Sequence, residues 1–325
     1  MKLIQPHGQP NYGRFSEAPE EINLQDYHNS FLSNPFKQKL RYKKFSFVAI
    51  QHDQFSIGIA VADLAWVGHG FYYCHDRTTE KSDDFHALQP VSLATQVQEA
   101  TRHNQFNCFK SRNIEIYSRQ NKKSRAITVL RQGNILCQAE IDCRQRQPLY
   151  MCSPTGVRGW TYTHKSMALP VQGYVNFQGE KLEFNSQTLA SLDDSCGYLR
   201  PETEWFWLSC QTWLEGKTVA INLASGVNES VGNENCLWIN GILHALDDVI
   251  FERINARTWH IFSLNQQVEL TVYTTWRRYE KINAGIMASE FSQWMAVING
   301  YITVDGQRQN FNTVAALLEE HYARW

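Results

Sequence analysis

The chain has 325 residues and a formal net charge of −1, a size that suits one large or two medium domains. The near-neutral charge excludes the basic surface that nucleic-acid-binding proteins carry. The sequence contains no run of about 18 apolar residues, which excludes a membrane-spanning helix. Its first residues lack the apolar segment of a signal peptide, so we expect a cytoplasmic protein.

Aromatic side chains are abundant, with ten tryptophans, 17 phenylalanines and 14 tyrosines. Rings of this size fill wide interiors and suit strands better than helices. None of the eight cysteines forms a Cys-x-x-Cys pair, so we expect free buried thiols instead of a zinc site. The sequence also lacks a glycine-rich phosphate loop, a Gly-x-Ser-x-Gly elbow and a His-Glu-x-x-His motif. We therefore expect neither a metal nor a cofactor.

The first half reads as a β-domain preceded by an irregular arm, because residues 1–35 contain four prolines and little periodicity. Short strand-like runs then follow at 40–50, 55–61, 66–74, 113–117, 125–130 and 135–143. A segment rich in proline and glycine, residues 144–159, separates the halves. We place the boundary inside it, which gives predicted domains at 1–155 and 156–325. Regularly spaced short strands predict a barrel or a sandwich in each.

The second half contains a hairpin whose register follows from its turn. Glu215-Gly216 lies between two strand-like runs, and side chains alternate between the two faces of a strand. A two-residue turn at this point sets Trp207 opposite Ala224. The same register places four candidate residues on one face: Thr203, Trp205, Trp207 and Asn222.

Asn240-Gly241 is the strongest hairpin signal in the chain, because both positions tolerate positive φ. This turn pairs Cys236 with Ala245 and, at the strand ends, Glu234 with Asp247. Two carboxylates side by side repel each other. Either the strand ends are splayed and solvated, or one carboxyl is buried and holds a proton. Both alternatives stay open at this point.

The last residues predict a short C-terminal helix, for which Asn312 or Thr313 is a suitable N-cap. Apolar residues recur at helical spacing at positions 314, 317, 318, 322 and 325. We expect this stripe to pack on a barrel, with Glu320 and His321 on the exposed side.

Several short motifs occur in an order that resembles a known family. They are Pro148-Leu149-Tyr150, Tyr162-Thr163-His164-Lys165, Asp193-x-Ser195-x-Gly197-Tyr198, Thr203-x-Trp205-x-Trp207, Asn222-Leu223, Glu234-Asn235, Asn240-Gly241 and Glu320-His321-Tyr322-Ala323-Arg324-Trp325. On these motifs the chain resembles the domain of unknown function 2804 family. That family is similar, more distantly, to the two-barrel lipocalin-like proteins that include carotenoid hydratases and tocopherol cyclase. The resemblance implies an all-β fold of two tandem calycin-type antiparallel barrels, and an apolar ligand. One departure is Cys196, where the family pattern has a basic residue that would pair with Asp193.

The first functional hypothesis is a protein that binds an apolar, isoprenoid or lipid-like small molecule. Closed barrels of lipocalin size enclose one such ligand. A mainly apolar pocket with a few polar anchors is typical of small-molecule sites. The ligand-binding candidates are Lys165, Thr203, Trp205, Trp207, Asn222 and Asn235. The competing interpretation is that the tryptophans fill the barrel and leave no cavity.

The second hypothesis is a cofactor-free hydratase, cyclase or isomerase that acts on an isoprenoid-like alkene. A carboxylic acid kept neutral by burial protonates the double bond, with Glu234 as the first candidate and Asp193 as the second. Tryptophan faces stabilise the resulting cation, and Lys165 neutralises the other carboxylate. A third hypothesis, a protein-interaction scaffold, rests on Phe206 and Leu208, which lie opposite the tryptophan face.

Overall fold

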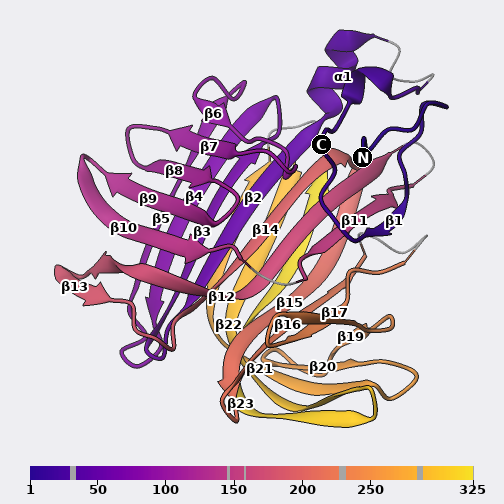
Figure 1. Ribbon diagram of the computed structural model, residues 1–325. Coiled ribbons are helices and arrows are strands. Elements are labelled where there is room, and N and C mark those ends of the chain that lie inside the picture. Colours follow the sequence, from indigo (N-terminus) through magenta and orange to yellow (C-terminus); the bar gives the residue numbers. More distant parts are fainter. Residues whose placement is uncertain (30–33, 145–146, 157–158, 227–231, 284–287, 325) are drawn as a thin grey trace. The chain divides into compact units, whose positions relative to one another are not determined.

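The computed structural model describes residues 1–29, 34–144, 147–156, 159–226, 232–283 and 288–324. The chain divides into two compact units, Met1–Leu199 and Arg200–Trp325. Each unit is built on its own antiparallel sheet (Figure 1). The described residues also include a short α-helix, α1 (Pro35–Arg41), and a 3-10 turn, η1 (Leu24–Asp26). Neither helix has the length and apolar character needed to cross a membrane.

The first sheet follows the chain closely, since most neighbours in the sheet are neighbours in sequence. Its strands are β1 (Gly13–Phe15), β2 (Lys43–Gln51), β3 (Phe55–Asp63), β4 (Val67–Asp76), β5 (Ser82–Pro90), β6 (Thr95–Gln96), β7 (Gln105–Lys110), β8 (Glu115–Gln120), β9 (Ser124–Arg131), β10 (Asn134–Asp142), β11 (Leu149–Pro154), β12 (Trp160–Phe177), β13 (Glu180–Glu183) and β14 (Leu189–Tyr198). The main path runs β5-β4-β3-β2-β14-β12-β10-β9-β8-β7-β6, while β1, β11 and β13 pair at its side.

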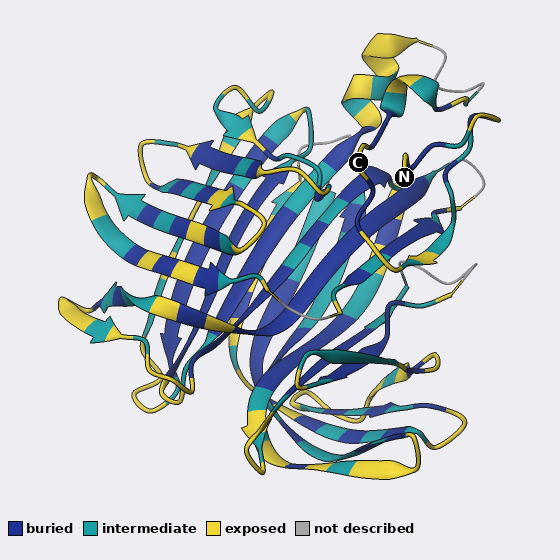
Figure 2. Cartoon of the chain, in the orientation of Figure 1, coloured by how far each residue is buried: buried dark blue, intermediate teal, exposed yellow. Residues whose placement is uncertain are grey.

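The first sheet curls so that strands from its two ends share one apolar core. Phe109 of β7 packs directly against the backbone at Gly70 of β4. Along β9 and β10, buried residues that face this core alternate with more exposed ones (Figure 2). The inward positions of β14 change in character: Leu192 belongs to this core, Asp194 is polar, and Tyr198 belongs to a second, aromatic cluster. A polar layer therefore separates two apolar clusters.

The second sheet also curls around its own core. Its strands are β15 (Glu202–Leu214), β16 (Lys217–Ser225), β17 (Cys236–Ile239), β18 (Ile242–Ala245), β19 (Ile250–Arg253), β20 (Thr258–Phe262), β21 (Val268–Asn283), β22 (Ala288–Val304) and β23 (Gln307–Arg324), in the order β18-β17-β16-β15-β23-β22-β21-β20-β19. Leu208 of β15 is completely buried in this core, and Phe206 packs against it and stacks on Phe251 of β19. These two residues therefore form no exposed patch for a protein partner.

The all-β prediction is confirmed, and the two curled sheets are one nearly closed barrel and one half-barrel. The predicted hairpin at Glu215-Gly216 is confirmed as well, because Trp207 lies opposite Ala224. The position of the turn alone therefore determined which residues of β15 and β16 share a face.

The Asn240-Gly241 hairpin is confirmed up to the pair of Cys236 with Ala245, where its ladder ends. Beyond that pair the Asn235 amide donates to the Asp247 main-chain carbonyl at 3.1 Å. Glu234 and Asp247 are therefore not cross-strand partners, and the expected repulsion between their carboxylates does not arise from the ladder.

The predicted C-terminal helix is wrong, because Gln307–Arg324 forms strand β23. This strand is central in its sheet and pairs with β15 on one side and β22 on the other. Its residues Ala316 and Leu318 join the core, while Leu317 is buried on the opposite face. An apolar run buried on both faces reproduces helical spacing, and two ladders of backbone hydrogen bonds outweigh local propensity. Trp325 lies outside the described residues.

The structure divides the chain farther along than the expected boundary between residues 155 and 156. β11 and β12 lie on either side of that point and pair with each other. β12 also pairs with β10 and β14, so it is an integral strand of the first sheet. The first unit accordingly extends to Leu199. The segment rich in proline and glycine connects two strands of one sheet and is not a linker between units.

Candidate functional site

A polar and aromatic patch lies on the second sheet, on the face opposite its apolar core. Side chains alternate between faces, so the neighbours of the core residues Phe206 and Leu208 belong to this other face. Four adjacent strands contribute to it: β15, β23, β22 and β21. We call it the Trp205 patch. Its members form two rows of cross-strand partners: Trp205, His321, Phe291 and Glu280, and Trp207, Glu319, Gln293 and Arg278.

Glu319 is the hydrogen-bonding centre of the Trp205 patch. The Trp205 indole N–H donates to its Oε1 at 2.8 Å, and the Gln293 amide donates to its Oε2 at 3.0 Å. A carboxylate that accepts a hydrogen bond on each oxygen is stabilised in its ionised form. Glu319 is therefore suited to hold a polar group beside the ring row.

The His321 imidazole lies between two aromatic rings of its own row. Its centroid is 4.2 Å from the Trp205 ring and 5.1 Å from the Phe291 ring. Its Nε2 makes a 2.8 Å hydrogen bond with the Ser289 hydroxyl. All three rings are half-buried. The row thus offers a band of apolar surface with one proton-carrying group at its centre.

A buried ion pair completes the Trp205 patch at β21. Arg278 Nη2 donates to Glu280 Oε2 at 2.8 Å, and these two side chains are 1% and 10% exposed. The guanidinium also lies over the Phe291 ring, 5.6 Å from its centroid. Burying a charged side chain costs free energy unless the charge is paired and hydrogen-bonded. Here Arg278 and Glu280 each provide the other's counter-charge.

Trp205 and Trp207 both belong to the patch, and a third predicted residue, Asn222, supports Trp207 on the same face from the adjacent strand β16. The Trp207 indole N–H donates to Asn222 Oδ1 at 2.7 Å, and the Asn222 amide donates to the Glu234 main-chain carbonyl at 2.8 Å. Asn222 is completely buried. Both ends of this amide are thus engaged within the protein, which is usual for a buried amide. Asn222 therefore orients Trp207.

The remaining predicted residues of the second unit make contacts with its own backbone. Asn235 Oδ1 accepts from the Ala224 N–H at 2.7 Å, and its amide donates to the Asp247 carbonyl at 3.1 Å. The Thr203 hydroxyl donates to a main-chain carbonyl at 3.2 Å. Glu234 is buried, with 7% of its surface exposed. The asparagine and the threonine fix the backbone around the patch.

Asp193 and Lys165 belong to the first unit, so the structure divides the predicted residues between the two units. They are cross-strand partners on β14 and β12, and Lys165 Nζ donates to Asp193 Oδ2 at 2.5 Å. Lys165 thus supplies the cation that Cys196 does not. The ion pair joins two neighbouring strands of the first sheet, which gives Asp193 a structural partner.

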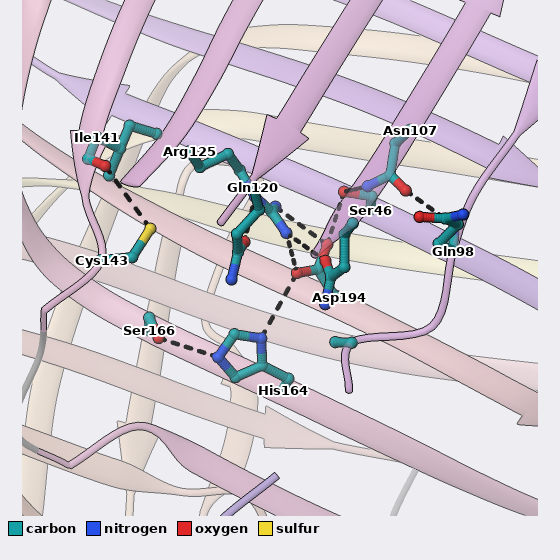
Figure 3. A network of polar contacts seen from close by, with 12 residues as sticks. Ser46, Gln98, Asn107, Gln120, Arg125, Ile141, Cys143, His164, Ser166 and Asp194 are labelled. Carbon is teal, nitrogen blue, oxygen red and sulfur yellow. Dashed lines mark hydrogen bonds and ion pairs between the residues drawn. The ribbon is translucent and has the colours of Figure 1, made fainter. Parts of the chain in front are cut away.

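The buried layer around Asp194 is a second polar site, which sequence reasoning did not single out (Figure 3). Arg125 of β9 binds this carboxylate through both terminal nitrogens, at 3.2 Å to Oδ1 and 2.6 Å to Oδ2. The Ser46 hydroxyl donates to Oδ1 at 2.6 Å. Burial alone raises the pKa of Asp194. The charge of Arg125 and the hydrogen bonds from His164 and Arg125 nevertheless hold this pKa well below its ordinary value.

His164 extends the layer by linking a serine to Asp194, so that serine, histidine and aspartate follow one another as in the catalytic triad of a hydrolase. Ser166 Oγ lies 3.1 Å from its Nε2, and Asp194 Oδ2 lies 3.5 Å from its Nδ1 (Figure 3). The Tyr150 ring stacks on the imidazole at 4.9 Å. All three members of this order are buried, and Arg125 already neutralises the carboxylate. The layer therefore fits a structural cross-link between strands better than nucleophilic catalysis.

A cleft of about 530 Å³ opens near the ends of β7, β8 and β9 in the first unit. Its lining is rich in amide side chains, among them Gln105 and Gln120. The side-chain oxygens of these two residues accept from Arg125 at 3.0 and 2.6 Å. The cleft is a polar extension of the Asp194 layer, and none of the predicted site residues, all of which are described, lines it.

Sequence reasoning missed most of the Trp205 patch because it treated the C-terminal segment as a helix. A strand at 307–324 places Glu319 and His321 on one face by simple alternation. The residues on β22 and β21 follow only from pairing between strands, and the sequence carries no local signal for that pairing. The one sequence signal that pointed to the patch was the option of assigning the last residues to a strand instead of a helix.

A comparison with curated protein sequences finds no match. Among solved structures, CghA with Sch210972 aligns with a TM-score of 0.57 at 7% identity, covering 86% of this chain and 88% of that chain. Kievitone hydratase from Nectria haematococca aligns with a TM-score of 0.47 at 8% identity, covering 96% of each chain. A putative AttH from Nitrosomonas europaea aligns with a TM-score of 0.46 at 12% identity, covering 88% of this chain and 93% of that chain. The likeness to CghA concerns the fold alone.

Family membership rests on a match along the whole sequence. A family model described as Domain of unknown function (DUF2804) matches residues 1–325. This agrees with the motif order from Pro148 to the C-terminal residues that suggested the same family. The chain therefore belongs to the DUF2804 family.

Proposed function

We propose that the protein binds a small molecule with an apolar, isoprenoid or lipid-like body on the Trp205 patch. The row of Trp205, His321 and Phe291 carries this proposal, because three half-buried rings stand side by side on three strands. Aromatic rings offer large apolar contact areas, and small-molecule sites combine such surfaces with a few polar groups. Glu319 supplies such a group in the neighbouring row.

The fold comparison supports the proposal at a coarser level. CghA, whose structure was determined with Sch210972, shows that a protein of similar fold holds a bound compound. In the present chain, the half-buried Glu319 carboxylate accepts hydrogen bonds from the Trp205 indole and the Gln293 amide, which places a polar group beside the ring row. We infer that a ligand hydroxyl or amine group binds there, while the apolar body lies along the ring row.

Native mass spectrometry of the gently purified protein, followed by lipid identification, tests this proposal directly. Trp205→Leu removes the indole and its hydrogen bond to Glu319, and we expect at least about a tenfold loss of affinity for the co-purified compound. Farnesol serves as a defined isoprenoid probe in calorimetric titrations. The matched control is Trp213→Leu, since Trp213 lies on the same strand and is 37% exposed. Equal binding by both variants would contradict the assignment of the patch.

A second candidate function is cofactor-free hydration, cyclisation or isomerisation of an isoprenoid-like alkene. Burial of Glu234 favours it, because the mechanism requires an acid in a site that excludes water. Trp207 is linked through Asn222 to the Glu234 main-chain carbonyl, so the ring and the backbone that carries the acid belong to one hydrogen-bonded unit. In this mechanism Glu234 gives its carboxylic proton to one alkene carbon, and the indole faces of Trp205 and Trp207 stabilise the cation. The cation then adds water or a second double bond, or loses a proton from a neighbouring carbon, and the proton released returns to the Glu234 carboxylate.

Glu234→Gln separates the two functions. The amide keeps the shape of the side chain but cannot supply a carboxylic proton. For the enzyme we expect binding within about twofold of the wild type and a loss of turnover of about 10²–10⁴-fold, measured on the co-purified compound. Glu204→Gln, at an exposed position of β15, is the control. Unchanged turnover, or a variant that no longer folds, would show that Glu234 is not the acid.

A further inference from the structure

The first unit gathers its exposed apolar side chains at one rim of its sheet. In the described part of this unit, six large hydrophobic side chains are exposed, and all but Met1 lie at or beside this rim. They are Phe36, Trp66, Leu88, Val91 and Leu93. Single exposed apolar residues are normal on any protein, whereas a gathered group marks an interaction surface.

Hydrogen bonds join the segments of this rim into one surface. Lys43 Nζ donates to the Leu40 carbonyl at the end of α1 at 3.0 Å, and to the Leu64 carbonyl in the β3–β4 turn at 2.7 Å. The Val91 N–H then donates to the Trp66 carbonyl at 2.7 Å. Figure 2 shows exposed residues along α1 and around β6 at this same end of the sheet. The apolar tips are therefore neighbours in space.

The backbone holds the tip between β5 and β6 in an uncommon conformation. Val91 and Ser92 have φ angles of 49° and 50°. Positive φ is rare for any residue with a side chain and is an outlier for a β-branched residue such as valine. Leu93, which follows directly, is 80% exposed. The fold thus presents apolar side chains to solvent on a constrained turn, and such constrained positions cluster at functional sites.

Cations accompany the apolar tips. Helix α1 contains Lys37, Lys39 and Arg41, all exposed, and no acidic residue. None of these three forms an ion pair within the described residues. The main-chain N–H of Lys110, another exposed cation, donates to the Ala94 carbonyl beside the β5–β6 tip at 3.0 Å. The rim therefore combines apolar tips with positive charge, although the net charge of the chain is −1.

We propose that this rim docks on the surface of an anionic lipid bilayer. Trp66 and Leu93 enter the interfacial region, where indole rings and aliphatic side chains are favoured. The cations of α1 face the lipid headgroups, and each basic residue near an anionic surface strengthens binding by about fivefold. A protein partner would use the apolar tips equally well, but it has no general need for the unpaired cations of α1. The charge therefore decides in favour of the bilayer.

Co-sedimentation of the full-length protein with lipid vesicles tests this inference. We expect binding to vesicles that mix phosphatidylcholine with phosphatidylserine, little binding to phosphatidylcholine alone, and weaker binding at high salt. Leu93→Ser removes an apolar tip and is expected to weaken binding by about tenfold or more. The pair Lys37→Gln/Lys39→Gln is expected to weaken binding by about 25-fold, as two cations at fivefold each.

Matched controls exclude general effects of lost charge or lost exposed apolar area. Leu264→Ser changes a leucine of the second unit that is 83% exposed, and Lys122→Gln/Lys123→Gln removes two exposed lysines of the β8–β9 turn. Binding of both controls at wild-type strength supports the proposal. The proposal is overturned if the protein fails to sediment with anionic vesicles, or if rim and control variants bind alike. It is also overturned if the rim substitutions change only the oligomeric state, which would assign the surface to a protein partner.

Discussion

The buried layer around Asp194 permits a sharp test of the energetics through the substitution Arg125→Met. Methionine retains an unbranched side chain but removes the guanidinium, which binds Asp194 at 2.6 Å and also donates to Gln105 and Gln120. The two charged side chains are 0% and 3% exposed, so Asp194 would be left buried without its counter-ion. Removing one partner of a buried ion pair costs about 3–5 kcal/mol. We expect this loss in the free energy of unfolding of the first unit.

The double variant Arg125→Met/Asp194→Leu separates the cost of unpaired charge from the cost of lost packing. The layer lies between two apolar clusters, so an apolar pair would join them into one core. Replacing both partners of a buried ion pair with apolar residues is often neutral or stabilising by about 1–4 kcal/mol. We therefore expect the double variant to unfold at a higher urea concentration than either single variant.

Urea unfolding followed by circular dichroism reports these differences as shifts of the midpoint. The control is Arg144→Met, because Arg144 pairs with Asp142 at 2.5 Å on the surface, where such pairs contribute about 0–1 kcal/mol. The reasoning is refuted if Arg125→Met is as mild as this control. It is equally refuted if the double variant is less stable than both single variants.

Three further outcomes are expected. Burial raises the pKa of the Cys210 thiol from 9.0 to about 12, so the folded state retains a proton that the unfolded chain loses above pH 9. The free energy of unfolding should therefore fall by about 1.4 kcal/mol between pH 8 and 10 for this thiol, and Cys210→Ala should reduce that slope in urea titrations. Gly70→Ala places a Cβ against the Phe109 ring, which should cost about 1–3 kcal/mol and lower the melting temperature. Asn222→Leu leaves the Trp207 indole N–H without its acceptor, which should cost about 1–3 kcal/mol in the same melting experiment.

The hairpins of the second sheet were predictable because turn chemistry and strand alternation act locally. Glu215-Gly216 and Asn240-Gly241 adopt positive φ at both turn positions, the geometry that a tight hairpin requires. Once a turn is fixed, every pair in the hairpin follows by counting. The shared face of Trp207 and Asn222, where the indole donates to the amide, was therefore within reach of the sequence.

The hairpin turns do not determine which face of β15 lies toward the core. Both faces of β15 are apolar or aromatic, with Leu208 on one and Trp207 on the other. Alternation shows only that these residues face opposite sides, and a choice between two such faces depends on the rest of the sheet. The tryptophans were expected to surround an interior pocket, and the structure instead puts Trp207 on the face away from the core.

The same difficulty separates Asp193 from Asp194. The motif around Ser195 drew attention to Asp193, which pairs with Lys165 on one face of β14. Asp194 is the next residue, so its side chain points to the other face and binds Arg125 of β9. This partner is far away in sequence, and no local pattern indicates the contact. Pairing across the sheet, and not residue type, determined which aspartate is completely buried.

The central position of β23 has a consequence for how the second sheet assembles. β15 reaches β16 through a local hairpin, but it reaches β23 through pairs such as Cys210 with Ala316, about a hundred residues apart, and such distant pairing is slow. β23 itself pairs with β22 through a local hairpin that begins at Val304 and Gln307, so until it inserts beside β15 the strands β15 and β23 each present an open edge with unpaired backbone groups, on which other chains can add. The same insertion carries Glu319 and His321 to the side of Trp205. A nascent chain thus stays vulnerable to aggregation until the strand that completes the sheet also completes the proposed ligand surface.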